Sequence, residues 1–241
     1  MRQLVEWLNT NRLSLNIAKT QYMVFSRGRH LPDCVLNGSL GNNSIQKVSS
    51  TKFLGIIIDD KINWKEHIKY TKSKVAKATG IICTCTRNLN PSSLTLLYNS
   101  LIYPYLLYGI EVWGSACTTI LQPLRVMQKK AIRIICFAPF RAHTSALFRE
   151  KKLLQLDKIY DYRVLLFMFK YFNNLLPNVF GELFILNNQI HDYPTRQSSH
   201  IHVARPATDM ISRCIRYKAI SIWNSLPFDI KQQSTCASFN K

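Results

Sequence analysis

Acidic residues are scarce in this sequence. The 241 residues include 13 Asp and Glu against 32 Lys and Arg, so the formal net charge is +19 at pH 7. The basic excess is distributed along the whole chain and is not confined to a tail. A globular chain this basic indicates a polyanionic partner, which is usually nucleic acid. The spread of the charge favours a long binding track over a single docking patch.

Glycine and proline are also few, with 8 and 9 residues, and the sequence contains no internal repeat. These numbers exclude a collagenous or low-complexity chain. Hydrophobic residues make up 47% of the chain and charged residues 19%, which is a globular composition. The length is sufficient for one large domain or two small ones with a real core.

The N-terminus lacks an apolar signal segment, and no apolar run is long enough to span a bilayer. The most apolar stretch, residues 101–113, is short and contains Pro104 and Glu111. A spanning helix needs roughly 20 predominantly apolar residues. We therefore expect a protein that is not secreted, has no membrane partner and resides in the nucleus or the cytoplasm. The sequence makes no prediction of oligomeric state.

The seven cysteines form neither a disulfide framework nor a zinc motif. They are odd in number and scattered, without a Cys-x2-Cys pair or a Cys/His set at zinc spacing. We expect reduced, buried thiols and no metal site. The six histidines have no recognisable serine or carboxylate partner, so the sequence predicts no hydrolase triad.

The first sixty residues have the pattern of a small α+β unit. A helix is expected over residues 2–11, and short buried strands over 22–25 and 53–58, where apolar residues are continuous. Asn37-Gly38 between apolar residues predicts a hairpin turn. The predicted fold class is therefore α+β, with a small N-terminal antiparallel sheet followed by a mostly helical region.

Beyond residue 60, apolar residues recur at helical spacing, and capping residues precede several of these segments. Residues 186–210 lack this periodicity and are predicted to be a loop or linker. Helices are expected to begin near Trp64, Pro91, Thr118, Asp157 and Ile211. Four aromatic residues of segment 98–113 are interpreted as core, namely Tyr98, Tyr105, Tyr108 and Trp113.

Two segments carry the most specific pattern in the chain. The first is Leu13-Ser14-Leu15-Asn16-Ile17-Ala18-Lys19-Thr20-Gln21-Tyr22-Met23-Val24-Phe25, and the second is Phe53-Leu54-Gly55-Ile56-Ile57-Ile58-Asp59. Together they resemble the back half of the reverse transcriptase palm of non-LTR retrotransposons of the jockey-like kind. Later strings resemble the region that follows the polymerase in these elements: residues 103–114, 141–144, 173–177, 191–196 and 223–227.

The resemblance implies part of an RNA-directed DNA polymerase. The palm would end within residues 1–60, a thumb-like region would cover 61–185, and a linker with a C-terminal helical segment would cover 186–241. Lys19 would be an accessory catalytic lysine near the leaving pyrophosphate. Phe53, Leu54 and Gly55 would form a primer-grip hairpin, in which Gly allows close approach of the backbone. The family's catalytic aspartates have no counterpart, so we expect a catalytically incomplete chain without its own cofactor. Mg²⁺ belongs to the complete enzyme.

Two predicted helices carry unbalanced positive charge. An unbalanced helical stripe is a natural place for a phosphate backbone, so we predict that these residues bind an RNA template with a DNA primer or target DNA. A solvated helix face is the alternative for any single lysine. The candidates are Lys65, Lys69, Lys72 and Lys74 on the first helix, and Arg125, Lys129, Lys130 and Arg133 on the second.

Asp59-Asp60 is the one adjacent carboxylate pair at the end of an apolar strand. Such a pair can hold Mg²⁺ for phosphoryl transfer, but a polymerase needs a third carboxylate from a neighbouring strand. We favour the interpretation that the pair ends a strand and begins the turn into the next helix. Three hypotheses remain: a catalytically incomplete reverse transcriptase, a nucleic-acid-binding protein retained without catalysis, and a working polymerase that uses Asp59 and Asp60.

Overall fold

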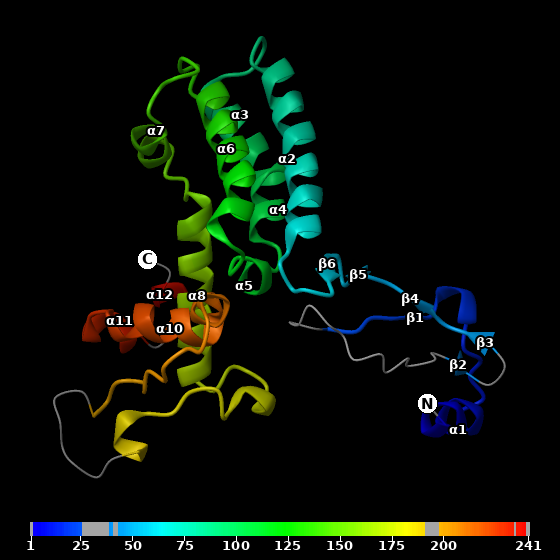
Figure 1. Cartoon of the computed structure of the whole chain (residues 1–241). Coiled ribbons are helices and arrows are strands. Elements are labelled where there is room, and N and C mark those ends of the chain that lie inside the picture. Colours follow the sequence, from blue (N-terminus) through cyan, green and yellow to red (C-terminus); the bar gives the residue numbers. More distant parts are fainter. Residues whose placement is uncertain (1, 26–38, 41–42, 191–197, 234, 240–241) are drawn as a thin grey trace. The chain divides into compact units, whose positions relative to one another are not determined.

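The structure, a computed structural model, describes residues 2–25, 39–40, 43–190, 198–233 and 235–239. Tertiary contacts divide the chain into two units, Met1–His67 and Ile68–Lys241. Figure 1 colours them from blue to cyan and from cyan to red along the chain. The first unit contains short strands and the second is helical, as the α+β pattern of the sequence predicts in outline.

Within the described residues, the first unit contains three separate two-stranded sheets instead of the single antiparallel sheet that we predicted. Two pairs are antiparallel and one is parallel. The pairs are β1 (Gln21–Tyr22) with β4 (Gln46–Lys47) in parallel, β2 (Ser39–Leu40) with β3 (Asn43–Ser44), and β5 (Ser50–Phe53) with β6 (Ile56–Asp59). Helix α1 (Arg2–Thr10) and the short 3-10 helix η1 (Ile17–Lys19) precede them. The predicted turn at Asn37-Gly38 lies outside the described residues.

The predicted buried strand over residues 53–58 is instead a hairpin. Strands β5 and β6 pair antiparallel, with Phe53 opposite Ile56. Leu54 and Gly55 connect them with φ of 45° and 85°. Positive φ at both central residues is the pattern of the turn that best matches strand twist, and Gly makes it accessible. Because a two-stranded ribbon covers little surface, Ile56, Ile57 and Ile58 are only half-buried.

The strand predicted over residues 22–25 is also shorter than expected. It ends at Tyr22, and the Phe25 side chain is 54% exposed. The apolar run Tyr22–Phe25 therefore does not become a buried core strand. Apolar continuity cannot distinguish such a segment from a true core strand, because burial depends on a second layer that must cover it.

The second unit is built from helices whose starts were largely predicted. The first four predicted starts are confirmed within one residue, whereas the last predicted helix is divided in two at Cys214, which is extended with ψ of 158°. The helices are α2 (Lys65–Cys85), α3 (Pro91–Leu101), α4 (Tyr103–Leu107), α5 (Ile110–Trp113), α6 (Thr118–Ile135), α7 (Thr144–Glu150), α8 (Leu156–Phe172), α9 (Asp209–Arg213), α10 (Ile215–Asn224), α11 (Phe228–Lys231) and α12 (Cys236–Phe239).

Helix α3 illustrates how the local sequence sets a helix start. The Asn90 side chain accepts a hydrogen bond from the Ser93 backbone N–H at 2.9 Å, and Pro91 occupies the first helical position. Both choices satisfy or remove backbone donors that have no partner inside the helix. Leu94 and Tyr98 then follow on the buried face.

Helix α8 is the central element of the second unit and contacts α4, α5, α10 and α12. Its apolar residues are distributed around the helix, as expected for a helix with neighbours on several sides. The approach of α5 depends on Gly114, since a Cβ atom there would lie 2.4 Å from the Tyr160 ring of α8. Glycine at position 114 therefore allows α5 to pack closely against α8.

One buried polar side chain connects α3, α6 and α8. The Gln128 side-chain amide donates to the Tyr98 hydroxyl at 2.8 Å and to the Leu154 carbonyl at 2.9 Å. Its Oε1 accepts from the Leu156 N–H at 2.9 Å. A buried amide is tolerated when its groups are paired in this way. Burial also raises the pKa of Tyr98 to about 12.

The prediction that four aromatic residues of segment 98–113 are core is half correct. Tyr98 and Trp113 are fully buried, whereas Tyr105 and Tyr108 are 40% and 57% exposed. The reason is an interruption of the helix: α3 ends at Leu101, and the short α4 and α5 follow instead of one long helix. A single helical periodicity therefore places Tyr105 and Tyr108 on the wrong side.

Residues 186–210 were predicted to be a loop or linker, yet part of this segment is held in place. Leu186 and Ile201 form an antiparallel bridge. The Asn224 side chain accepts from the Ile201 N–H at 3.1 Å and donates to the Ile201 carbonyl at 3.0 Å. This contact gives the Trp223-Asn224 string a structural role, because it attaches the segment to α10.

Candidate nucleic-acid interface

Asp59 is part of the turn between β6 and α2. Its carboxylate accepts hydrogen bonds from the backbone N–H groups of Lys61 (3.2 Å), Asn63 (3.0 Å) and Trp64 (2.8 Å). The side chain is 6% exposed. These contacts agree with the interpretation that Asp59 ends a strand and shapes the turn into the following helix. Its oxygens already have donors, so Asp59 is poorly suited to hold a metal ion.

The turn that Asp59 supports has an unusual backbone. Ile62 and Trp64 have φ of 51° and 67°, values that non-glycine residues rarely adopt. Each such residue costs on the order of 1 kcal/mol, and the surrounding contacts must hold it in place. The three hydrogen bonds that the Asp59 carboxylate accepts help to hold the turn in this conformation.

His67 follows in the first turn of α2 and faces strand β6. Its Nδ1 accepts a hydrogen bond from the Ile57 N–H at 3.3 Å, and the residue is 3% exposed. An accepting Nδ1 requires the neutral ring. Burial disfavours the charged form and lowers the pKa of His67 to about 4.

The lowered pKa of His67 predicts acid-sensitive stability. Between about pH 6.5 and pH 4, the unfolded chain binds a proton at this residue and the folded chain does not. The free energy of unfolding should therefore fall as the pH falls through this window, by up to about 3 kcal/mol. Thermal unfolding of the wild type and of His67→Gln across this range measures the effect. Equal pH dependence of the two proteins would contradict it, and His143→Gln, at an exposed site, is the control.

The basic residues of α2 separate into two groups. Lys65, Lys69 and Lys72 are exposed, and their spacing of four and three residues places them on one face of the helix. This group is called the α2 lysine stripe below. Lys74 lies on another face, is half-buried and has its ammonium 5.5 Å from the centre of the Tyr70 ring. The structure therefore does not bring Lys74 together with the stripe.

Two of the four basic residues of α6 have structural partners. Arg125 binds Asp157 through Nε and Nη2, with a shortest distance of 2.8 Å, and also donates to the Thr118 carbonyl. Arg133 donates through Nε to the Ala142 carbonyl at 3.0 Å. Of the four predicted residues on this helix, Lys130 is exposed and Lys129 is half-buried. Arg125 and Arg133 are therefore used for internal contacts.

The other predicted residues lie in the first unit. Phe53 and Leu54 are 60% and 74% exposed at the tip of the β5–β6 hairpin, next to Gly55. Lys19 is exposed at the end of η1, where its backbone N–H donates to the Asn16 side chain at 3.2 Å. Its ammonium has no ion-pair partner among the described residues. The tip of the hairpin therefore exposes two large apolar side chains, Phe53 and Leu54.

No group of three or more His, Cys, Asp or Glu side chains that could hold a metal ion occurs in the part of the chain that the structure describes. The same described residues include no helix that is both long and apolar enough to cross a membrane. Several carboxylates have basic partners instead, including Glu111 with Arg163, where Nε lies 2.6 Å from Oε1.

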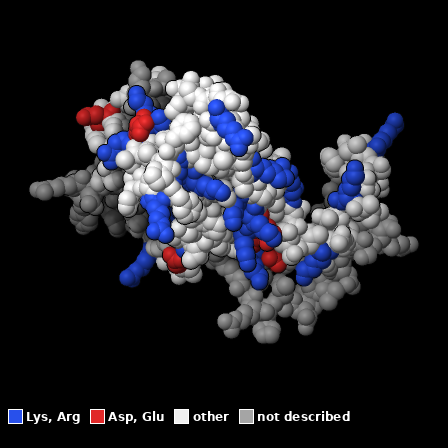
Figure 2. Space-filling model, turned by 90° about the horizontal axis from the view of Figure 1, so that it is seen from above, with Lys and Arg blue, Asp and Glu red and all other residues white. Residues whose placement is uncertain are grey.

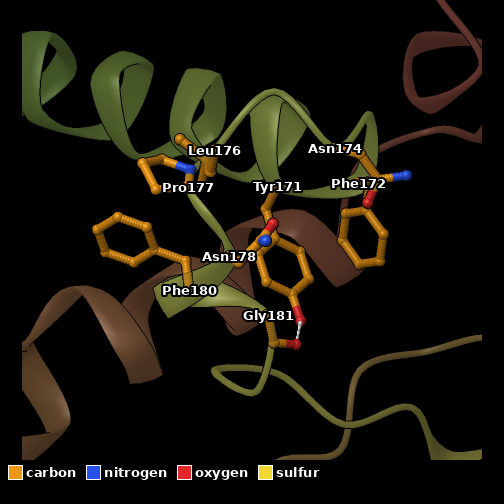
Figure 3. Close-up of a pocket in the computed structure, with 8 residues that line it drawn as sticks. All are labelled: Tyr171, Phe172, Asn174, Leu176, Pro177, Asn178, Phe180 and Gly181. Atoms are coloured by element: carbon orange, nitrogen blue, oxygen red, sulfur yellow. Dashed lines mark hydrogen bonds between the residues drawn. The ribbon is translucent and has the colours of Figure 1, made fainter.

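An open pocket of about 220 Å³ follows α8 (Figure 3). The hydroxyl of Tyr171 donates to the Gly181 carbonyl at 2.8 Å beside it, as Figure 3 shows. The described lining residues offer no acid or base apart from this phenol, so the pocket lacks the groups for acid–base catalysis. Its lining consists of Tyr171, Phe172, Asn174, Leu176, Pro177, Asn178, Phe180 and Gly181.

Two exposed aromatic residues were missed as candidates from the sequence. Phe137 and Phe140 follow α6 and are 57% and 81% exposed. Aromatic residues next to an amphipathic helix are usually core, so the sequence offered no signal for their exposure. The neighbouring Pro139 and Arg141 are compatible with a surface loop but do not require one.

Comparison with curated proteins shows which proteins this chain is similar to. The chain is 29% identical over 160 residues to the RNA-directed DNA polymerase from mobile element jockey of Drosophila melanogaster, which is 64% of this chain and 17% of that protein. The corresponding Drosophila funebris protein is 28% identical over the same share. A probable RNA-directed DNA polymerase from transposon X-element of Drosophila melanogaster is 23% identical over 61% of this chain and 16% of its own length.

The chain is thus a distant homologue of jockey-like non-LTR retrotransposon reverse transcriptases, as the resemblance of its motifs predicts. It spans about one sixth of the length of the relatives that it matches. No family model matches the chain. No solved structure matches it either.

Proposed function

We propose that this chain holds the template–primer nucleic acid of a jockey-like RNA-directed DNA polymerase and does not add nucleotides by itself. In this proposal, residues 1–60 are the end of the palm, 61–185 a thumb-like region and 186–241 a linker with a C-terminal helical segment. The ligand is an RNA template with a DNA primer or target DNA. The β5–β6 hairpin acts as the primer grip, and Lys19 acts only beside a complete active site.

The observation that carries the proposal is the charge of the helical region. Between Glu66 and Glu150 the sequence has 11 Lys and Arg and a single acid, Glu111. Glu111 is itself bound by Arg163, so it does not offset the basic surface. Figure 2 shows one face of the molecule on which Lys and Arg greatly outnumber Asp and Glu. Such a surface attracts phosphates by releasing counterions.

The local structure of Asp59 supports the absence of catalysis by this chain alone. Phosphoryl transfer in polymerases uses Mg²⁺ held by carboxylates, which orients and neutralises the reacting phosphate. Here the Asp59 carboxylate accepts three backbone hydrogen bonds and is buried in a turn. Of the Asp59-Asp60 pair, this leaves Asp60 as the carboxylate that could contact a metal ion. The described residues therefore do not fit the two-metal chemistry of the complete enzyme.

The alternative is a non-catalytic nucleic-acid-binding protein derived from a retroelement. The same basic surface supports it. The two proposals differ in the ligand: a polymerase part should prefer an RNA–DNA hybrid with a primer end, whereas a general binding protein should bind duplex DNA of the same sequence equally well.

Primer extension and binding in the same solutions test the proposal. We expect the purified chain to bind an RNA template–DNA primer, with affinity that falls steeply as salt is raised, and to incorporate no nucleotide with Mg²⁺ and dNTPs. The slope of log affinity against log salt should correspond to several phosphate contacts. Mg²⁺-dependent extension that disappears in Asp59→Asn would instead establish a working polymerase. Absence of binding at low salt would refute the proposal.

A further inference from the structure

The loop between α6 and α7 presents two aromatic rings to solvent. Phe140 is 81% exposed and Phe137 is 57% exposed, which makes Phe140 one of the most exposed large apolar side chains among the described residues. Neither ring is needed to fill the core of the helical unit. Single exposed apolar residues are ordinary on protein surfaces, but two aromatic residues three positions apart in one short loop require another explanation.

The loop is held in a defined conformation by its own hydrogen bonds. The Ala138 N–H donates to the Arg133 carbonyl at 2.9 Å, and the Ala142 N–H donates to the Pro139 carbonyl at 2.9 Å. The Arg133 side chain donates to the Ala142 carbonyl at 3.0 Å, which ties the end of the loop to α6. Both rings are therefore displayed from an ordered backbone, and little conformational entropy is lost when a partner binds.

Exposed basic residues lie in the loop and on the two helices beside it, namely Arg141 in the loop, Lys130 on α6 and Arg149 on α7. Residues 112–149 contain six Lys and Arg and no acid. In Figure 1 the loop after α6 lies at the same end of the helical unit as the loop after α2, which carries exposed Arg87. Figure 2 looks onto the molecule from that side and shows few acidic side chains among the basic ones. Charge complementarity therefore selects a polyanion as the partner of this surface.

We propose that Phe137 and Phe140 stack on the bases of a single-stranded nucleic acid at this end of the helical unit. Aromatic rings beside basic residues bind unpaired bases, because stacking needs an open base face and the basic groups hold the backbone. A duplex keeps its base faces covered and offers the rings no such contact. The inference rests on the nucleic-acid binding proposed above and adds the strand state of the ligand and the residues that recognise it.

Variants of the full chain test this inference. Binding is measured to a short single-stranded RNA and to a duplex of the same length and sequence. We expect Phe140→Ala to weaken single-strand binding by about tenfold, a typical loss for one stacked base, and to leave duplex binding unchanged. Phe140→Trp should retain single-strand binding. The matched control is Phe228→Ala, which removes a ring that is 69% exposed elsewhere and should bind like the wild type.

A base analogue provides the second readout. An oligonucleotide that contains 2-aminopurine loses fluorescence when the analogue stacks on a ring, and the quenching should be absent with Phe140→Ala. If the wild type binds single strands and Phe140→Ala binds them equally well, or weakens duplex binding to the same extent, stacking at this loop is wrong while the proposed function stands. If the wild type binds neither nucleic acid, the proposed function itself fails. Unchanged thermal unfolding of Phe140→Ala verifies that the fold is intact.

Discussion

Replacement of Lys65, Lys69 and Lys72 by glutamine is expected to weaken binding of an RNA–DNA duplex by about 100-fold at low salt. The three side chains are exposed on one face of α2, where a phosphate backbone can contact them in succession. Each phosphate contact that is lost removes one released counterion. The slope of log affinity against log salt should therefore decrease by about one per lysine. Filter binding or fluorescence anisotropy across a salt series measures both quantities.

A matched control separates the stripe from the overall charge. Lys152→Gln, Lys158→Gln and Arg216→Gln together remove the same charge from exposed positions outside α2. At physiological salt this variant should lose much less affinity than the stripe variant, because long-range attraction is screened there. It should also keep most of the salt slope. If both triple variants weaken binding equally, the ligand is attracted by net charge alone and the α2 lysine stripe is not its contact surface.

Asp59→Ala is expected to destabilise the turn between β6 and α2 by about 3 kcal/mol or more. The substitution leaves the N–H groups of Lys61, Asn63 and Trp64 without their acceptor. It also removes the contacts that hold Ile62 and Trp64 at positive φ. Amide hydrogen exchange of residues 56–70 should show the loss directly, since opening of this turn exposes these amides to solvent.

Asp60→Ala is the matched control for this prediction. Asp60 is the adjacent carboxylate, is half-buried, and its side chain has no hydrogen-bond partner among the described residues. Its removal should change the protection of residues 56–70 by less than about 1 kcal/mol. Equal effects of the two alanine variants would show that Asp59 has no special structural role. Asp59 would then return as a candidate for metal binding, to be tested by Mg²⁺-dependent extension.

The structure also changes how the basic residues are interpreted. On α2 the lysines project from a helix that buries a neighbouring face through Ile68, Val75 and Ile82. On α6 the arginines are used to hold Asp157 and the carbonyl of Ala142. Spacing along a helix is visible in a sequence, but the partner of an arginine is not. The basic residues of α2 and α6 are similarly spaced, but those of the α2 lysine stripe are exposed to a ligand whereas the arginines of α6 hold the protein's own groups.

Several features were determined by the sequence alone. The helices of the second unit follow from apolar residues at helical spacing and from caps such as Asn90 before Pro91. The buried face of α2 follows from the same periodicity. The order of the motifs established the relationship to jockey-like reverse transcriptases, and the net charge of +19 indicated a polyanionic partner. These features are local or additive, so they can be read from neighbouring residues and from composition.

Other features were decided only by the tertiary structure. The chain turns back at Leu54-Gly55 instead of continuing a strand. The helix that begins at Pro91 is interrupted after Leu101, and Tyr105 and Tyr108 are exposed. Arg125 meets Asp157, 32 residues away, and Phe140 is left in solvent. Burial and pairing of these side chains depend on which distant segment reaches them. Local preferences therefore predicted the elements of this protein, whereas long-range contacts decided which of its charged and aromatic groups remain available to a ligand.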